Sequence, residues 1–203
     1  MSESTDVLQI GKEAQDLLFR AARTANTFSG EPVSEEQVRA IHDLVKFGPT
    51  AMNTQPLRVA LLRSEESRRR LAPLMAEGNR AKTVSAPLVA VLGFDSEFHL
   101  KGERFFPERA EMVAQAFADE TGRIPAARLN AALQAAYFII GVRAAGLAAG
   151  PMVGFDAAGI DAEFFPGGTF RTFMMVNIGK PGADHPQFPR LPRYDYEDVY
   201  TEF

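Results

Sequence analysis

Apolar and polar residues alternate at helical spacing in the segment after residue 33. One helical face carries Val38, Ile41, Leu44 and Val45. The preceding Ser34-Glu35-Glu36-Gln37 is a capping-box sequence, because Ser34 can accept from the third helical amide while Gln37 reaches back. Gly48-Pro49 then ends the segment, since glycine adopts a left-handed cap and proline cannot continue a helix. The pattern predicts a helix from Ser34 to about Gly48.

Short apolar runs bounded by turn residues predict three strands, at 57–63, 87–94 and 173–178. Two further helices are expected. One begins after Ser64 and runs through Leu74, and the other covers about 126–147. Asp156 has the position of a cap for another short helix. The tail from Gly182 onward is rich in proline, so we expect it to be extended and to lie across a surface rather than form a helix.

The most apolar stretch runs from Ala131 to Gly150 and has two interpretations. A membrane span needs about 20 nearly uninterrupted apolar residues. Gln134 and Arg143 interrupt this stretch, and its glycines weaken it as an isolated helix, so the sequence favours a central core or interface helix. Small residues would let another helix approach closely, which makes a subunit interface plausible; they are Ala131, Ala132, Ala135 and Ala136.

Composition and charge narrow the function classes. With 203 residues, 46% of them hydrophobic and 24% charged, the chain has the size and composition of one globular domain covering residues 1–203. A net charge of −4 argues against nucleic acid as the partner. The absence of cysteine removes disulfides, thiolate nucleophiles and cysteine-ligated metals. The amino-terminal residues lack the pattern of a secretory signal, so we expect a cytoplasmic protein.

Several familiar catalytic motifs are missing from the sequence. His42, His99 and His185 have no partner at metal-ligand spacing, so no metal site is expected. The chain has no G-x-S-x-G elbow, no phosphate-binding G-x-x-x-x-G-K-[ST] loop and no G-x-G-x-x-G after a strand. If this protein uses a nicotinamide cofactor, it does not hold it with the usual dinucleotide fingerprint.

Four separated polar patches remain as candidates for ligand binding: residues 23–28, 48–56, 79–82 and 150–156. The first patch suits a phosphate or a heteroaromatic edge, although such a patch by itself is more often an ordinary polar helix end. In the second patch two prolines clamp a loop of hydroxyls and amides between a helix and a strand. The third places Asn79 and Lys82 about one helical turn apart. The glycines of the fourth allow backbone amides to approach a flat ligand closely.

Taken together and in this order, the patches resemble the nitroreductase family, over about Arg20 to Arg193. Within that family the sequence is most similar to the RutE-type malonic semialdehyde reductases. The likeness lies in Ala22-Arg23-Thr24, Gly48-Pro49-Thr50, Gly78-Asn79, Gln134-Ala135-Ala136-Tyr137, Gly150-Pro151-Met152-Val153-Gly154-Phe155-Asp156 and Arg190-Leu191-Pro192-Arg193.

The resemblance implies an α+β fold with a mainly antiparallel central sheet flanked by helices. It also implies a homodimer whose carboxyl-terminal tail crosses to the partner, with FMN bound in a groove at the subunit interface. Arg23, Thr24 and Asn26 would face the FMN phosphate or pyrimidine side, and Arg190 and Arg193 would add phosphate-binding guanidinium groups. The partner subunit would line the flavin with its own Pro49, Thr50, Ala51 and Asn53. Asn79 and Lys82 would reach the pyrimidine end, and Met152, Val153 and Gly154 would lie near N5.

The resemblance also implies an activity. NADH or NADPH would deliver hydride to flavin N5 and leave, and a small-molecule acceptor would then use the same open face. A RutE-like acceptor is malonic semialdehyde, reduced to 3-hydroxypropionate, with Arg104 or Arg109 binding its carboxylate. The alternative activity is broad reduction of nitroaromatics and quinones. The non-enzymatic alternative is a module that binds flavin without turnover.

Three positions depart from the common family pattern. Asn26 stands where many members have a second basic residue, and Leu57 where an aromatic residue is frequent. Phe188 stands two residues before Arg190, where a basic residue is often found. We therefore expect fewer positive partners for the phosphate, unless Arg193 compensates.

Overall fold

The computed structural model describes residues 8–183 and 189–203. The strands are β1 (Leu57–Leu62), β2 (Leu88–Asp95), β3 (Ala148–Met152) and β4 (Phe170–Gly179). The helices are α1 (Lys12–Gln15), α2 (Glu35–Val45), α3 (Glu65–Leu71), α4 (Glu77–Ser85), α5 (Gly102–Phe105), α6 (Ala110–Ala116), α7 (Glu120–Ala144), α8 (Ala157–Phe164) and α9 (Tyr196–Val199). A π-helical turn, Asp16–Arg20, follows α1, and 3₁₀ turns occupy Ala51–Asn53, Ala72–Leu74, Phe98–Lys101 and Pro107–Arg109.

The four strands form one sheet in the order β1-β2-β4-β3, and all neighbouring pairs are antiparallel. Every residue of β2, one of the two inner strands, is buried. Strands β1 and β3 are the two edges, and Gly150 of β3 pairs with Asn177 of β4. The predicted α+β fold with a mainly antiparallel sheet between helices is therefore confirmed.

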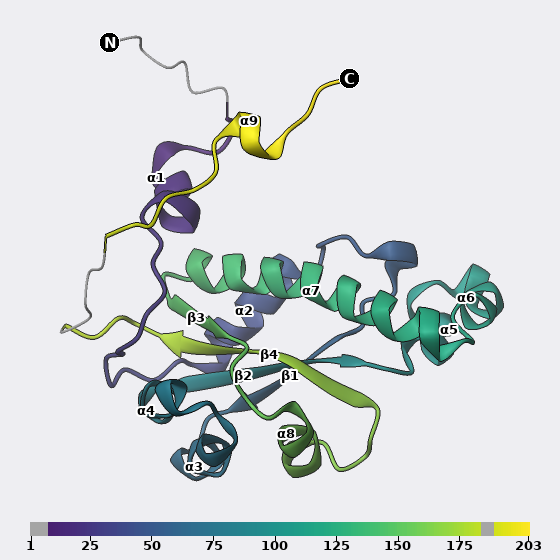
Figure 1. Ribbon diagram of the computed structural model, residues 1–203, viewed down its shortest axis with the longest axis horizontal. Coiled ribbons are helices and arrows are strands. Elements are labelled where there is room, and N and C mark those ends of the chain that lie inside the picture. Colours follow the sequence, from purple (N-terminus) through teal and green to yellow (C-terminus); the bar gives the residue numbers. More distant parts are fainter. Residues whose placement is uncertain (1–7, 184–188) are drawn as a thin grey trace.

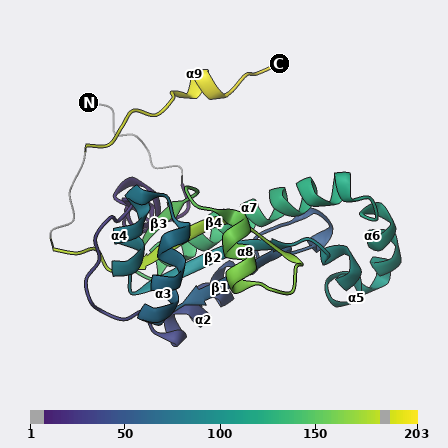
Figure 2. The same cartoon turned by 60° about the horizontal axis from the view of Figure 1, so that its bottom comes forward.

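Helices cover both faces of the sheet (Figure 1). Side chains of β2 alternate between the faces, as in any strand. Leu88 and Leu92 pack toward α7 and α2, in a core that includes Phe138 and Val142. Val89 and Val91 pack on the other side, against Leu71 of α3 and Ile160 of α8. The long helix α7 thus lies over the opposite face from α3 and α8, and α5 and α6 lie at its amino-terminal end (Figures 1 and 2).

The predicted capping box of α2 is present. Ser34 Oγ accepts from the Gln37 amide at 3.1 Å, and Gln37 Oε1 accepts from the Ser34 amide at 2.9 Å. Helix α2 packs closely on α7, where a Cβ at Gly141 would overlap Val45 Cγ1. A glycine in the middle of α7 is therefore explained by this close helix contact.

Helix α7 begins at Glu120, earlier than the predicted start near 126, because Asp119 caps it by accepting from the Thr121 amide at 3.2 Å. Pro125 lies inside the helix. Only half of the small-residue run faces outward: Ala131 and Ala135 are buried in the chain's own core. Within residues 8–183 and 189–203, no helix is long and apolar enough to cross a membrane.

Strand β3 was not predicted from the sequence. Gly150 and Pro151 are typical turn residues, which hides the strand in the sequence. Pro151 is tolerated because β3 is an edge strand, where one amide has no neighbouring strand to bind. The segments predicted as strands at 57–63, 87–94 and 173–178 are β1, β2 and β4, with no end shifted by more than three residues.

We expected the tail to contain no helix, and this prediction is wrong because the tail contains one short helical turn. Residues 196–199 form α9, where the Asp195 amide donates to Asp198 Oδ2 at 3.2 Å and the Tyr196 and Tyr200 rings stack with centroids 4.7 Å apart. The rest of the described tail is extended and mostly exposed. It is joined to the chain where Gly182 donates to Thr27 and Arg190 to Arg20 and Ala22, and its end projects away from the sheet (Figures 1 and 2). Phe188 and His185 lie outside the described residues.

Candidate functional site

The sheet edge formed by β3 brings the first and fourth polar patches together with the tail. A Cβ at Gly150 would lie 3.0 Å from the Ala25 carbonyl oxygen, so segment 23–26 runs close along β3. Arg190 Nη2 donates to the carbonyl oxygens of Arg20 and Ala22, the latter at 3.2 Å. Arg23 and Arg190 are therefore neighbours at this edge, although they are far apart in sequence.

The third patch meets the fourth at Gly154. The Gly154 carbonyl accepts from Asn79 Nδ2 at 3.2 Å and from the Ala76 amide at 3.0 Å. A Cβ at Gly154 would lie 3.0 Å from Asn79 Nδ2, so a larger residue would push Asn79 away. Asn79 and Lys82 are one turn apart on α4, as expected.

Lys82 is joined to the sheet through a residue that sequence reasoning missed. Asn177 is fully buried on β4, and its Nδ2 donates to the Lys82 carbonyl at 3.1 Å. Because Asn177 is the register partner of Gly150, Lys82 lies beside the β3 edge. Asn177 is the one polar residue in the otherwise apolar run Phe173–Ile178, and this was the sequence signal that could have indicated a special role for it.

Arginines gather at this edge without acidic partners. Within residues 8–183 and 189–203, none of Arg23, Arg143 and Arg190 forms an ion pair with a carboxylate. Burial lowers the pKa of Arg143 from its usual value, and the nearby Arg190 guanidinium lowers this pKa further. Arg143 was not predicted as a site residue. The available signal was that it is a lone cation in the apolar stretch 131–150. Arg193 differs, because its Nη1 donates to the Leu191 and Pro192 carbonyls of its own tail, both at 3.0 Å.

Two backbone amides at this edge are available to a ligand. Val153 is 71% exposed, and neither its N–H nor that of Gly154 donates to a protein group in the described part of the chain. Met152, directly before them, is buried and fixes the end of β3. The arrangement presents two free donors on a rigid strand end.

The second patch lies at the opposite edge of the sheet, before β1. Three of its residues other than glycine have left-handed backbone: Met52 (φ 52°), Asn53 (φ 56°) and Gln55 (φ 44°). Such conformations cost about 1–3 kcal/mol each and persist only where surrounding contacts hold them. They cluster at functional sites more often than elsewhere.

Two amide side chains of α7 hold this loop in place. Asn130 Oδ1 accepts from the Ala51 amide at 2.7 Å, and Gln134 Oε1 accepts from the Leu57 amide at 3.0 Å. They are one helical turn apart and so reach the two ends of the loop. Asn53 Nδ2 adds a bond to the Phe105 carbonyl of α5 at 2.8 Å.

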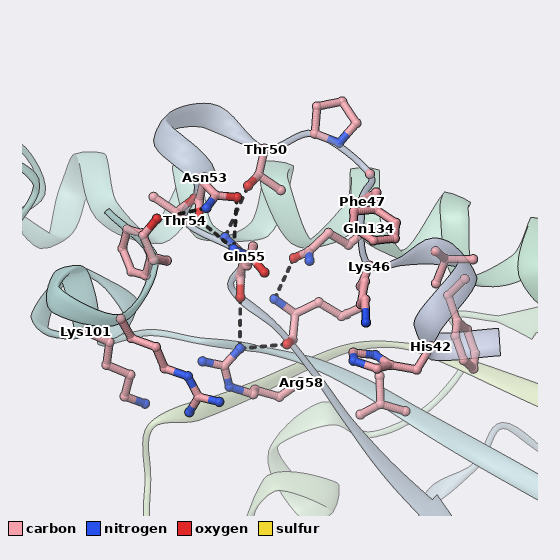
Figure 3. A pocket seen from close by; sticks show the side chains of 18 of the residues that line it. His42, Lys46, Phe47, Thr50, Asn53, Thr54, Gln55, Arg58, Lys101 and Gln134 are labelled. Atoms are coloured by element: carbon pink, nitrogen blue, oxygen red, sulfur yellow. Dashed lines mark hydrogen bonds between the residues drawn. The ribbon is translucent and has the colours of Figure 1, made fainter. Parts of the chain in front are cut away.

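Below the loop lies a cavity of about 1190 Å³ between α2, β1 and α5 (Figure 3). Its lining includes Pro49, Thr50 and Asn53 of the loop, with Phe105 and Phe138 as aromatic walls. The basic lining residues are His42, Lys46, Arg58, Lys101 and Arg104. Arg109 does not line the cavity; its guanidinium lies over the Phe106 ring, 5.7 Å from the centroid.

A buried carboxylate organises one end of this cavity. Asp95, at the end of β2, is fully buried and accepts from Arg58 Nη2 at 3.3 Å and from Lys101 Nζ. The Arg58 guanidinium also donates to the Gln55 and Leu57 carbonyls, at 2.9 and 2.8 Å. Arg58 therefore connects the buried acid to the strained loop.

Within one chain, the two sets of candidate residues do not come together. The loop 49–53 is attached to α7 at Asn130, whereas Arg143, the neighbour of Arg190, lies 13 residues further along the same helix. At 1.5 Å rise per residue this is about 20 Å. The loop precedes β1 and the other residues gather at β3, the opposite edge of the sheet.

Comparisons with known proteins match this chain along most of its length. The model of the "Nitroreductase family" matches residues 19–180. A relative from Streptomyces griseus, provisionally named NADH dehydrogenase/NAD(P)H nitroreductase, is 59% identical over 194 residues, covering 96% of this chain and 98% of the relative.

Solved structures show the same fold. A nitroreductase structure from Bacillus subtilis superposes with a TM-score of 0.81 at 22% identity, covering 94% of this chain and 99% of that one. A structure from Exiguobacterium sibiricum, described as a complex with FMN, has a TM-score of 0.77 at 18% identity, covering 96% and 99%. With a family model spanning most of its length and a relative this similar, the chain belongs to the nitroreductase family.

Proposed function

We propose that this protein is an FMN-dependent NAD(P)H oxidoreductase, as the provisional name of the S. griseus relative and the FMN in the E. sibiricum structure suggest. The observation that carries the proposal is the β3 edge, where arginines without carboxylate partners lie along the strand that ends in the free amides of Val153 and Gly154. Bound there, FMN would supply two-electron chemistry by taking up a hydride from NADH or NADPH and passing it to an acceptor.

The residues at the β3 edge fit the parts of FMN. Arg23 and Arg190, with Arg143 beside them, offer guanidinium groups with no competing carboxylate, which suits a phosphate. Thr24 and Asn26 lie on the same segment as Arg23. Gly154 has no Cβ, which lets Asn79 lie against the end of β3 and holds its amide beside the free backbone N–H groups.

The protein's own groups would orient and stabilise the bound ring. The N–H groups of Val153 and Gly154 are free to donate to the edge of the ring that carries N5, the atom near which the resemblance places these residues. Asn79 and Lys82 would bind the pyrimidine end, where a cation stabilises the negative charge of the reduced ring. No side-chain nucleophile is required by this chemistry.

A homodimer would complete the site. The loop residues Pro49, Thr50, Ala51 and Asn53 lie about 20 Å from the arginine cluster in one chain, so we infer that a second copy supplies them. Exposed apolar side chains on α7 (Leu129, Leu133, Tyr137) and on the projecting tail (Leu191, Tyr194, Phe203) suit burial against that copy, with the tail crossing to it. A sedimentation mass of one chain would contradict this arrangement.

For the acceptor we propose a small aldehyde acid, malonic semialdehyde, reduced to 3-hydroxypropionate in the cytoplasm. The hydride adds to the aldehyde carbon, and the oxygen takes a proton to give the alcohol. Arg104, which lines the cavity beside the loop, supports this proposal because it offers a cation for the carboxylate. The second candidate is broad reduction of quinones and nitroaromatics, favoured by the exposure of Val153 directly after β3.

Turnover of competing acceptors tests the proposal. With FMN-loaded protein and NADPH or NADH in excess, we expect malonic semialdehyde to give a higher kcat/KM than 1,4-benzoquinone or nitrobenzene. The product 3-hydroxypropionate is quantified in parallel, which separates aldehyde reduction from oxidation of the donor by oxygen. A quinone that turns over at least tenfold better than the aldehyde would favour the second candidate.

A further inference from the structure

The charges around the cavity of Figure 3 are unevenly distributed. Its lining contains Lys46, Arg58, Lys101 and Arg104, together with His42, and no aspartate or glutamate. The whole chain, in contrast, carries a net charge of −4. A cavity lined by one sign of charge concentrates ligands of the opposite sign.

Two of these cations are partly neutralised by one carboxylate. Asp95 is shared by Arg58 and Lys101, so this trio retains one positive charge. Lys46 is paired with Asp43 outside the cavity, at 2.7 Å. The Arg104 side chain forms no ion pair or hydrogen bond within residues 8–183 and 189–203. The excess charge therefore lies at the α5 end, on Arg104 and the Asp95 trio.

This basic end faces the loop that we propose as part of the flavin site. Figure 3 shows Arg58 and Lys101 below Thr50 and Asn53, while His42 and Lys46 lie on the other side of the cavity. Phe105 lies beside Arg104 and gives the same end an aromatic wall. A molecule anchored by an anionic group at Arg104 would extend its body along Phe105 toward the loop.

We propose that Arg104, supported by Lys101 and Arg58, forms an anion subsite that selects electron acceptors carrying a carboxylate. The subsite rests on the proposed function but does not depend on which group is reduced, so it applies to aldehyde acids and to carboxylated nitroaromatics alike. Asp95 holds Arg58 and Lys101 in place, so only Arg104 is left to bind a ligand with its full charge. Arg104 is thus the residue that determines specificity.

A matched pair of acceptors tests the subsite: 4-nitrobenzoate and 4-nitrobenzamide, which have the same size and the same reducible group. For Arg104→Gln we expect the ratio of their kcat/KM values, benzoate over benzamide, to fall roughly 10- to 100-fold, as for loss of a hydrogen bond to a charged group. The different intrinsic reactivities of the two compounds do not affect the change in this ratio, because the same two compounds are compared in both proteins. Arg104→Lys should restore part of the ratio, and Arg39→Gln on the exposed face of α2 is the control for lost charge.

Calorimetric binding of benzoate provides a readout that does not need turnover. We expect binding to weaken by a similar factor in Arg104→Gln, and to weaken with added salt in the wild type. Unchanged acceptor ratios and benzoate binding in Arg104→Gln would overturn the subsite, as would a ratio that falls only in Arg109→Gln.

The anion could also belong to the donor, because NADH and NADPH carry phosphates. A raised KM for NADPH or NADH in Arg104→Gln, with the acceptor ratio unchanged, would assign the subsite to the donor and overturn the acceptor assignment. Reduction of neither compound by a wild-type protein that binds benzoate would count against the proposed function, not against the subsite.

Discussion

Replacing Arg23 and Arg190 together with glutamine is expected to weaken FMN binding by roughly a thousandfold. Each guanidinium that binds a phosphate contributes about 1.5–3 kcal/mol, which corresponds to roughly 10- to 150-fold in affinity. The two side chains lie at the same sheet edge and have no carboxylate partner in the described residues, so their charge is available to the phosphate. Quenching of FMN fluorescence on titration with protein measures the effect.

Riboflavin, which lacks the phosphate, distinguishes phosphate binding from a structural role. Arg190 also donates to backbone carbonyls of residues 20 and 22, so its loss could loosen that segment. If the arginines bind the phosphate, the double variant should bind riboflavin as well as the wild type does. Arg39→Gln combined with Arg69→Gln, which removes two exposed helix pairs, is the charge-matched control. An equal loss of affinity for FMN and riboflavin would contradict the assignment.

The second large effect is expected at the strained loop before β1. Gln134→Met keeps the size of the side chain but removes the acceptor for the Leu57 amide. Leaving a half-buried amide unpaired costs about 1–3 kcal/mol, and the left-handed residues Met52, Asn53 and Gln55 lose one of their supports. We therefore expect unfolding in urea at a lower midpoint and FMN affinity reduced by roughly tenfold.

A conservative variant at the same position separates positioning from general instability. Gln134→Glu keeps an acceptor oxygen and should restore FMN affinity most of the way. Hydrogen exchange of the Leu57 amide, measured without flavin, should rise strongly in Gln134→Met and little in Gln134→Glu. Wild-type exchange and FMN affinity in Gln134→Met would show that the bond does not hold the loop.

Local sequence patterns predicted the elements whose signals are self-contained. The capping box at Ser34 and Gln37, and the Gly48-Pro49 stop, need only neighbouring residues, and α2 was predicted from them. Strand β3 was missed because its stability comes from pairing with β4, 20 or more residues later in the chain. Gly150 and Pro151 have poor strand propensity, and tertiary pairing overrides it.

The candidate site shows the same division between local and long-range information. The order of the polar patches pointed to Asn79 and Gly154, which the structure joins by a hydrogen bond. Asn177 and Arg143 were missed, because their roles depend on which elements pack beside them. Sequence alone also could not tell that loop 49–56 and the Arg23 segment lie at opposite sheet edges, since strand order is set by long-range pairing.

The most direct test of the central claim is the absorption spectrum of the protein after incubation with FMN and removal of the excess. The proposed function predicts a retained flavin spectrum that bleaches when NADH or NADPH is added without oxygen, and that returns when an acceptor is supplied. A protein that retains no FMN, or one whose flavin neither NADH nor NADPH bleaches, would contradict the assignment of the β3 edge as the site of an FMN-dependent oxidoreductase.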